Sequence, residues 1–421
     1  MSKIVTLGLL FFCLACGSLH AGDWPGFRGP DGNGIAPGES VPSEWGPEKN
    51  IRWKKPLPGP GNSSPIVSGG HVYLATAEDK GKKRHLICFD RATGDRVWVK
   101  TVEYDQAELS HETNPPCAST PVTDGERIVV WHGSPGIFCY DTQGKLLWER
   151  KLGNVEHIWG FGSSPILHRG AVIINYGPGV KSFVAALDLE SGEVLWTVDE
   201  PGGVGPDDKK LAGSWSTPIV ATVAGKEQII CSMPTRVVAY DPQNKGAILW
   251  SCGGMSSERG DLSYASPVIS GDLLVALGGY QGPAIGLKLG GSGDITETNR
   301  IWREAEKQPQ RIGSGVVVDG KLFIANAGPG TAQCIDCATG KTLWTERLNA
   351  GDHWGSCVLV DGKIYVTGQK GVTTVFRPNP EKFELVAEND LGESSNATPA
   401  ISAGEIFLRT DNNIYCVSEK K

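Results

Sequence analysis

The chain has 421 residues, a formal net charge of −7 and a composition rich in turn formers and indole, with 56 Gly, 27 Pro and 13 Trp. This charge argues against a broad basic surface of the kind that binds nucleic acid. Beyond the N-terminal apolar run, no segment is long and apolar enough to span a bilayer. The length admits one large domain or two ordinary ones.

The N-terminus has the pattern of an export signal. Lys3 precedes the apolar run IVTLGLLFFCLAC, and small residues follow up to Ala21. A run of this length is typical of a signal peptide and short for a membrane anchor. We therefore predict a signal peptide over residues 1–21 and export to the periplasm or the extracellular space. A lipid anchor on Cys16 is the alternative, and the sequence leaves open whether the leader is cleaved after Ala21 or lipidated.

After an N-terminal arm, residues 22–49, a hairpin pattern recurs along the chain. Each copy has an alternating apolar strand, an Asp, a loop with Gly or another turn former, and a second strand that closes on Trp. The copies are ICFDRATGDRVW (87–98), FCYDTQGKLLW (138–148), AALDLESGEVLW (185–196), VAYDPQNKGAILW (238–250) and QCIDCATGKTLW (333–344). Because a single hairpin is marginal in water, we expect the five copies to bury their indoles against one another.

A second pattern occurs eight times and sets the number of units. It consists of an apolar strand, a Gly or polar turn and another apolar strand, as in SSPIVSGGHVYLAT from residue 63 and ATPAISAGEIFLRT from residue 397. Equivalent positions are 42 to 56 residues apart. A period in this range with four short strands per unit is typical of a β-propeller blade. We predict an all-β fold, a single eight-bladed β-propeller over residues 50–421.

Trp-bearing strands complete the blades and indicate how the ring closes. NIRWKKPL (50–57) precedes any inner strand, and the last unit stops at Lys421 with no room for a fourth strand. We therefore predict that the N-terminal strand pairs with the last blade, which removes free sheet edges. The residues expected to dock each blade on its neighbour are Trp53, Trp98, Trp148, Trp196, Trp250, Trp302 and Trp344.

The motif A-x-D-x-x-T-G-x-x-x-W, matched closely by CFDRATGDRVW and CIDCATGKTLW, resembles the tryptophan-docking motif of pyrroloquinoline quinone (PQQ) repeat propellers. The resemblance covers residues 50–421, with a departure at AIGLKLGGSGDITETNRIW (284–302), where an insertion blurs the turn. The opening DWPGFRGPDGNGIAPG (23–38) resembles the start of secreted PQQ-like proteins, many of them labelled by likeness to the propeller lipoprotein of the outer-membrane barrel-assembly machinery. In such families the Trp stacks on the neighbouring blade.

Nine cysteines lie beyond the leader. Export favours disulfides, but Cys88, Cys139 and Cys334 each stand two residues before the turn Asp, and Cys416 falls on the matching strand. We therefore predict small buried core residues in different blades, too far apart to bridge. Cys334 and Cys337 form a C-x-x-C with no second pair or His nearby, so we predict no metal site.

The candidate binding site lies where the inner strands begin, because propeller loops that enter those strands converge on the mouth of the central channel. We expect a polar and aromatic funnel there, in which indoles stack on a planar or sugar-like ligand and Arg311 binds an anion. The alternative is that these side chains pack between blades, and no spacing assigns a catalytic role to any of them. The candidate residues are His111, Glu112, Asn114, His157, Trp159, Trp215, Arg259, Asp261, Tyr264, Arg311, Asp352, His353 and Trp354.

Three functions fit these features. We favour a non-catalytic binding or scaffold propeller at the cell envelope, a monomer with a protein or glycan ligand, because no catalytic motif accompanies the repeats. The resemblance implies as an alternative a PQQ-dependent alcohol or aldose dehydrogenase with PQQ and calcium. Those enzymes resemble one another in an adjacent Cys-Cys pair, which does not occur here. The third function is a cofactor-free sugar lyase or hydrolase with His157 or His353 as acid-base group.

Overall fold

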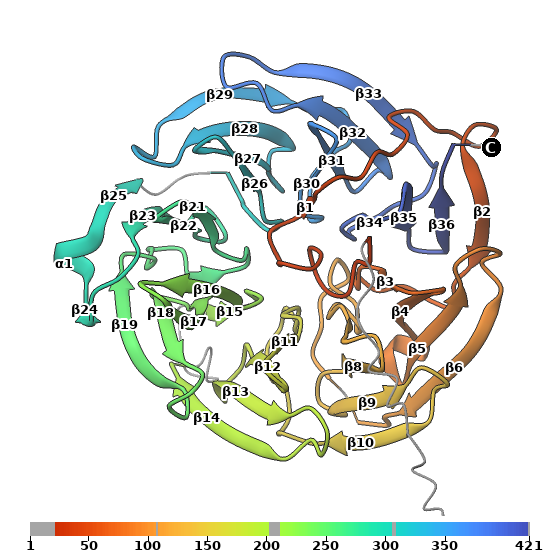
Figure 1. Cartoon of the computed structure of the whole chain (residues 1–421), viewed down its shortest axis with the longest axis horizontal. Coiled ribbons are helices and arrows are strands. Elements are labelled where there is room, and N and C mark those ends of the chain that lie inside the picture. Colours follow the sequence, from red (N-terminus) through yellow and green to blue (C-terminus); the bar gives the residue numbers. More distant parts are fainter. Residues whose placement is uncertain (1–21, 107, 202–210, 305–308, 420–421) are drawn as a thin grey trace, which may run out of the picture.

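The computed structural model describes residues 22–106, 108–201, 211–304 and 309–419. Eight sheets of four or five strands stand in a ring around a central axis (Figure 1). This confirms the prediction of an all-β, eight-bladed propeller. Residues 1–21, which hold the predicted signal peptide and Cys16, lie outside the described residues, so cleavage and lipidation stay predictions.

We number the blades from the first sheet that is complete in chain order. Blades 1 to 4 contain β3 (Ile66–Ser68), β4 (His71–Glu78), β5 (Lys83–Asp90), β6 (Arg96–Glu103); β7 (Val122–Thr123), β8 (Arg127–Trp131), β9 (Ile137–Asp141), β10 (Leu146–Arg150); β11 (Ile166–His168), β12 (Ala171–Tyr176), β13 (Ser182–Asp188), β14 (Val194–Glu200); and β16 (Ile219–Val223), β17 (Lys226–Ser232), β18 (Arg236–Asp241), β19 (Ala247–Gly253), with β24 (Gly293–Asp294) at the edge.

Blades 5 to 8 follow the same order from the axis outwards. They contain β21 (Val268–Ser270), β22 (Leu273–Leu277), β23 (Ala284–Lys288), β25 (Arg300–Glu304); β26 (Val316–Val318), β27 (Lys321–Ala325), β28 (Thr331–Asp336), β29 (Thr342–Arg347); β30 (Val358–Val360), β31 (Lys363–Thr367), β32 (Val372–Arg377), β33 (Glu384–Asp390), with β1 (Ile35–Ala36) on the inner side; and β34 (Ala400–Ser402), β35 (Glu405–Arg409), β36 (Asn413–Val417), β2 (Ile51–Pro56).

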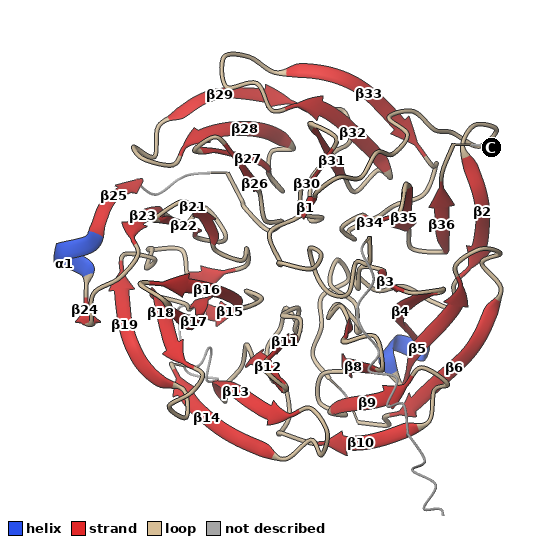
Figure 2. Cartoon of the chain, in the orientation of Figure 1, coloured by secondary structure: helices blue, strands red, loops and turns tan. Residues whose placement is uncertain are grey.

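Helix is scarce in this fold. Within the described residues it is confined to α1 (Thr296–Asn299) and the 3-10 turn η1 (Asp79–Gly81) (Figure 2). No helix in the described part of the chain is long and apolar enough to cross a membrane. A separate two-stranded parallel sheet, β15 (Ala212–Ser214) with β20 (Asp261–Ser263), lies ahead of blades 4 and 5.

Most outer strands carry a Trp that contacts the turn of the next blade. Trp53 Nε1 donates to the carbonyl of Arg91 over 2.9 Å, and a Cβ added to Gly94 would lie 2.6 Å from the Trp53 ring. Gly94 also has a φ of +72°. The turn therefore requires glycine both for its backbone conformation and for the close approach of the indole. The same bond to a backbone carbonyl of the next blade is made by Trp98, Trp148, Trp302 and Trp344.

Trp250 departs from this arrangement. Its Nε1 donates to Gln228 Oε1 of its own blade over 2.8 Å, and the indole is fully buried. The turn that would accept its hydrogen bond is absent from blade 5, because the insertion at residues 289–299 forms β24 and α1 instead. β24 pairs in parallel with β19 beside Trp250. The inserted segment thus covers the outer edge of blade 4, and the expected docking contact is replaced.

The ring closes through strands from opposite ends of the chain. β2 pairs antiparallel with β36, with Ile51 opposite Val417 and Pro56 opposite Asn413. The last blade therefore takes its outer strand from the N-terminal side, as the sequence predicts. This pairing is the long-range step that converts an open row of blades into a closed ring without a free terminal edge.

A second connection runs around the axis through the hydroxyl residue at the start of each inner strand. In seven of the eight steps around the axis, the backbone N–H of this position donates to the hydroxyl of the equivalent residue in the next blade, over 2.9 to 3.0 Å. Such bonds satisfy buried backbone donors that no β-ladder can reach. The eight residues of this hydroxyl ring are Ser64, Thr120, Ser164, Thr217, Ser266, Ser314, Ser356 and Thr398.

The N-terminal arm crosses the ring on the face where the inner strands end, and Figure 1 shows it in red over the centre. Trp24 exchanges two backbone hydrogen bonds with Val67 of blade 1. Arg28 Nη2 donates to the carbonyl of Gly315 in blade 6, and β1 then pairs with β30 of blade 7. The arm is therefore a strap that connects blades on both sides of the axis.

The core lies between adjacent blades. Seven clusters of buried apolar side chains occupy the successive interfaces, for example Tyr73 and Cys88 of blade 1 against Val130 and Tyr140 of blade 2. The nine cysteines of the described residues are buried and unpaired. This confirms their predicted place in the core, where a small apolar thiol fills the space between sheets.

Candidate functional site

A cavity of about 540 Å³ opens on the axis at the face where the inner strands begin. Phe27, from the arm on the opposite face, lies in its lining. The channel is therefore a cup with the arm at its floor and the strand-entry loops at its mouth. Its lining falls into three parts: an aromatic wall, a carboxamide wall and a floor of hydroxyls.

The aromatic wall comes from the loops that enter blades 2 to 5. The rings of His111 and Trp159 lie 4.4 Å apart at 31°, and those of Trp215 and Tyr264 lie 5.1 Å apart at 67°. The short sheet of β15 and β20 sets the second pair, because Trp215 N donates to the carbonyl of Ser263 over 2.8 Å. These two ring pairs line the cup with aromatic faces and with phenol and indole edges.

Arg259 and Tyr280 extend this wall at the mouth. The Arg259 guanidinium carbon lies 5.9 Å from the centre of the Tyr280 ring. Burial raises the pKa of Tyr264 far above its usual value, so its hydroxyl stays protonated and can donate a hydrogen bond.

The carboxamide wall comes from blades 6 to 8 and blade 1. Four amide side chains line it, namely Asn62, Gln310, Gln369 and Asn396, and Asp352 and Trp354 stand among them. This wall adjoins the aromatic one at blades 1 and 2, where Asn62 Nδ2 donates to Asn114 Oδ1 over 3.1 Å. The cup therefore presents mainly ring faces along blades 2 to 5 and mainly amide donors and acceptors along blades 6 to 8 and blade 1.

The hydroxyl ring forms the floor of the cup. Seven of its eight members line the cavity, all except Ser266. A hydroxyl that accepts a backbone hydrogen bond keeps its own hydrogen available to donate. The floor therefore presents donors toward the axis, close to Phe27.

Eight of the thirteen predicted site residues line this one cavity. They are His111, Asn114, Trp159, Trp215, Arg259, Tyr264, Asp352 and Trp354. The other five do not reach it, which corrects the predicted funnel. Glu112 is exposed on a turn beside the mouth, and Asp261 lies in β20, where its carboxylate accepts from Ser256 Oγ over 2.6 Å.

Arg311 is withdrawn from the cavity and does not serve as the predicted anion-binding group. Its side chain is fully buried, and Nη1 pairs with Glu304 Oε2 over 2.9 Å. Nη2 faces Gln333 Oε1 at 3.5 Å. A charge in this position is neutralised within the blade and carries no net attraction for a ligand at the mouth.

His157 and His353 lie behind the wall as neutral packing residues. Burial lowers the pKa of each to about 4. His157 Nδ1 accepts from the backbone N–H of Trp159 over 3.1 Å, and its ring lies edge-on to Trp215 at 4.9 Å. These contacts hold the backbone of Trp159 and the indole of Trp215, and neither imidazole is placed to exchange protons with a ligand in the cup.

Two further features were missed from the sequence. Gln369 and Tyr280 come from loops between the second and third strands of their blades, not from segments ahead of inner strands. The hydroxyl ring occupies the second position of the repeated SSP and STP strings, so its recurrence is visible in the sequence. The carboxamides give no comparable pattern.

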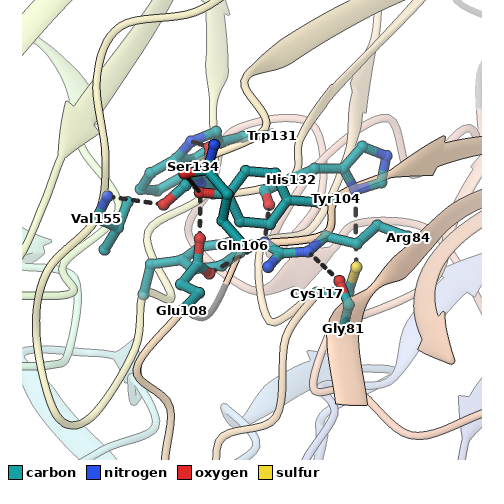
Figure 3. Close-up of polar contacts among 12 residues, drawn as sticks. Gly81, Arg84, Tyr104, Gln106, Glu108, Cys117, Trp131, His132, Ser134 and Val155 are labelled. Atoms are coloured by element: carbon teal, nitrogen blue, oxygen red, sulfur yellow. Dashed lines mark hydrogen bonds and ion pairs between the residues drawn. The ribbon is translucent and has the colours of Figure 1, made fainter. Parts of the chain in front are cut away.

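A separate polar cluster is buried between blades 1 and 2 (Figure 3). Arg84 Nη1 pairs with Glu108 Oε1 over 3.0 Å, and Cys117 Sγ lies 3.6 Å from His132 Nδ1. Burial raises the pKa of Cys117 to about 12 and lowers that of His132 to about 3. A neutral thiol beside a neutral imidazole is not an activated nucleophile, so the cluster is structural.

The described residues contain no group of three or more His, Cys, Asp or Glu side chains that could hold a metal ion. Among the described residues that line the cup, Arg259 has the only guanidinium and Asp352 has the only carboxylate. PQQ is a planar acid with several carboxylates and would need more cationic side chains than this lining supplies. A calcium ion would need more anionic oxygen ligands than the one carboxylate of Asp352. The residues present do not fit PQQ with calcium.

Comparison with solved structures shows the same fold at low identity. BamB from Moraxella catarrhalis is 13% identical, with a TM-score of 0.60, and the match covers 87% of this chain and 99% of that one. Quinohemoprotein alcohol dehydrogenase from Comamonas testosteroni is 13% identical with a TM-score of 0.67, covering 96% and 82%. The C-terminal WD40 domain of Sif2 is 12% identical with a TM-score of 0.57, covering 89% and 99%.

A search of curated proteins finds no match. A family model described as outer membrane protein assembly factor BamB matches residues 46–119, 106–346 and 328–421. These segments span nearly all of the propeller, including the closing strand β2 and the last blade. The chain therefore belongs to this family of PQQ-like propellers.

Proposed function

We propose that this protein is an exported, non-catalytic binding module of the cell envelope, and that the cup is its ligand site. The observation that carries the proposal is the composition of the cup. Its indoles, phenols, amides and hydroxyls suit recognition. The histidines expected to act as acid-base groups are buried behind the wall, with lowered pKa values.

The family favours an envelope location. Its description names an outer membrane protein assembly factor, and BamB of Moraxella catarrhalis has the same fold. The leader-like N-terminal sequence agrees with export. A binding propeller in that compartment recognises a protein or a glycan through the loops at its mouth.

A PQQ-dependent dehydrogenase is the second candidate, because the Comamonas testosteroni enzyme has the same fold and the cup has indoles that could stack on a planar ring. The poor fit of the charged lining residues argues against it. Titration of the purified protein with PQQ and calcium tests it directly, since micromolar quinone binding together with dye reduction by an alcohol or aldose would replace our proposal.

The proposed function is tested by export and by site-specific crosslinking. The full chain, with a C-terminal tag, is expressed in a Gram-negative host and fractionated, with a photo-crosslinking residue in place of Asp352 at the mouth or Leu343 at the outer edge. Leu343 is 37% exposed and lies on β29, the outermost strand of blade 6. We expect an envelope fraction and an adduct from the mouth position alone. A cytoplasmic protein, or adducts only from the edge position, would refute the proposal.

A further inference from the structure

We propose that the cup binds a neutral saccharide, a short oligosaccharide held between its two walls. This inference rests on the proposed function, in that the cup must be a ligand site. It adds the chemical class of the ligand, which follows from the aromatic rings, carboxamides and hydroxyls that line one cavity.

The aromatic wall matches the apolar face of a sugar ring. A pyranose presents C–H groups on its faces and hydroxyls around its edge, so it packs on an indole without losing its polar contacts. Trp159 and Trp215 belong to two separate ring pairs in this wall. Consecutive ring pairs along one wall suit a ligand with more than one sugar ring.

The carboxamide wall matches the hydroxyl edge. A primary amide offers two N–H donors and a carbonyl acceptor, and a sugar hydroxyl also donates and accepts, so each amide can pair with neighbouring hydroxyls. The side-chain amides of Gln310 and Gln369 make no hydrogen bond to any residue in the described part of the chain. A ligand can therefore bind these two amides without displacing a hydrogen-bond partner among the described residues.

The charge of the lining selects against an acidic ligand. Among the described lining residues there is one guanidinium, Arg259 on the aromatic wall, and one carboxylate, Asp352 on the carboxamide wall. A uronate or sulfated sugar would lose its hydration at the carboxamide wall without meeting a cation there. The cavity volume of about 540 Å³ is in the range of small-molecule sites, so the ligand is a short oligosaccharide and not a polymer threaded through the ring.

Binding is tested on a glycan array that carries neutral glucans, mannans, galactans and chitin oligomers beside the corresponding uronates and sulfates. Titration calorimetry then gives the Kd for the neutral oligosaccharide that binds best. We expect neutral glycans to be retained and acidic ones not. Retention of acidic glycans alone, or of none, would overturn the inference.

Variants test whether the bound sugar occupies the cup. Trp354→Ala removes a ring from the carboxamide wall and should weaken binding roughly tenfold, with Trp354→Phe restoring most of it. Gln369→Ala should weaken binding roughly threefold to tenfold. Gln143→Ala is the matched control, since Gln143 is exposed on a hairpin of blade 2. Binding unchanged in both Trp354→Ala and Gln369→Ala would refute a site in the cup.

The two proposals fail in different ways. If the array retains no neutral glycan while the crosslinker at the mouth still captures an envelope component, the saccharide is wrong and the binding module stands. If neither experiment gives a signal at the mouth, both proposals fall. Thermal unfolding of each variant, compared with the unmodified protein, separates loss of binding from loss of fold.

Discussion

The carboxylate of Glu393 holds together the strand pair that closes the ring. It lies in the loop before blade 8 and accepts hydrogen bonds from Lys54 Nζ on β2 and from Tyr415 on β36, each over 2.8 Å. Asn413 Nδ2 and Thr410 Oγ1 donate to it over 2.8 and 2.7 Å. Glu393→Gln keeps the size of the side chain but removes the charge and one acceptor oxygen, so we expect it to weaken the closure.

The magnitude follows from the pKa of Glu393. Burial raises this pKa, but the donors from Lys54, Asn413, Thr410 and Tyr415 outweigh burial and lower the pKa from 4.5 to about 2. A difference of this size corresponds to roughly 3 kcal/mol of folding free energy. The side chain is 17% exposed, so solvent screening removes little of it.

The pH dependence has a definite sign. The pKa of Glu393 is depressed in the folded state, so its contribution is complete above pH 4.5 and is lost as the pH falls toward about 2. By the same relation, about 1.4 kcal/mol of the stabilisation contributed by Glu393 remains at pH 3. The difference in stability between the unmodified protein and Glu393→Gln should therefore narrow steadily between pH 5 and pH 3.

Urea unfolding followed by tryptophan fluorescence at pH 7, 5, 4 and 3 measures this difference. Glu381→Gln is the matched control, because Glu381 is exposed in the loop between β32 and β33. We expect Glu393→Gln to lower the unfolding free energy by roughly 2 to 3 kcal/mol at pH 7 and Glu381→Gln to leave it nearly unchanged. A difference that stays constant from pH 7 to pH 3, or one below about 0.5 kcal/mol at pH 7, would refute this account of the closure.

Three further predictions concern the ring and its core. Thr398→Val leaves the backbone N–H of Ser356 without its acceptor at 2.9 Å and should cost about 1 to 3 kcal/mol in urea unfolding, whereas Thr398→Ser should cost less. Gly94→Ala should destabilise the folded protein by more than Gly69→Ala. Both positions have positive φ, but only at Gly94 would an added Cβ lie 2.6 Å from the Trp53 ring. Equal midpoints of urea unfolding for the two variants would contradict this. The nine cysteines of the described residues are buried with raised thiol pKa values, so a thiol reagent should label them only after unfolding.

The architecture could be predicted because the local sequence of each blade specifies its strands and turns. The alternation and turn of ICFDRATGDRVW specify a hairpin, and its recurrence at a propeller period specifies the number of blades. The outer strand at Trp53, which precedes any inner strand, also indicated the closure with β36 that the structure has. Trp250 is the exception, since its contact depends on the path of an insertion in the next blade.

The composition of the cup is decided by the tertiary structure. Trp159 and His157 are two residues apart in one loop, yet Trp159 lines the cavity and His157 is buried behind it. Whether a side chain ahead of an inner strand faces the axis or the blade interface depends on loop geometry set by packing, which short-range sequence does not encode. Gln369 and Tyr280 join the site because the closed ring brings loops from distant blades to one mouth. The sequence alone thus determined the repeating unit, and only ring closure determined which side chains face each other across the axis.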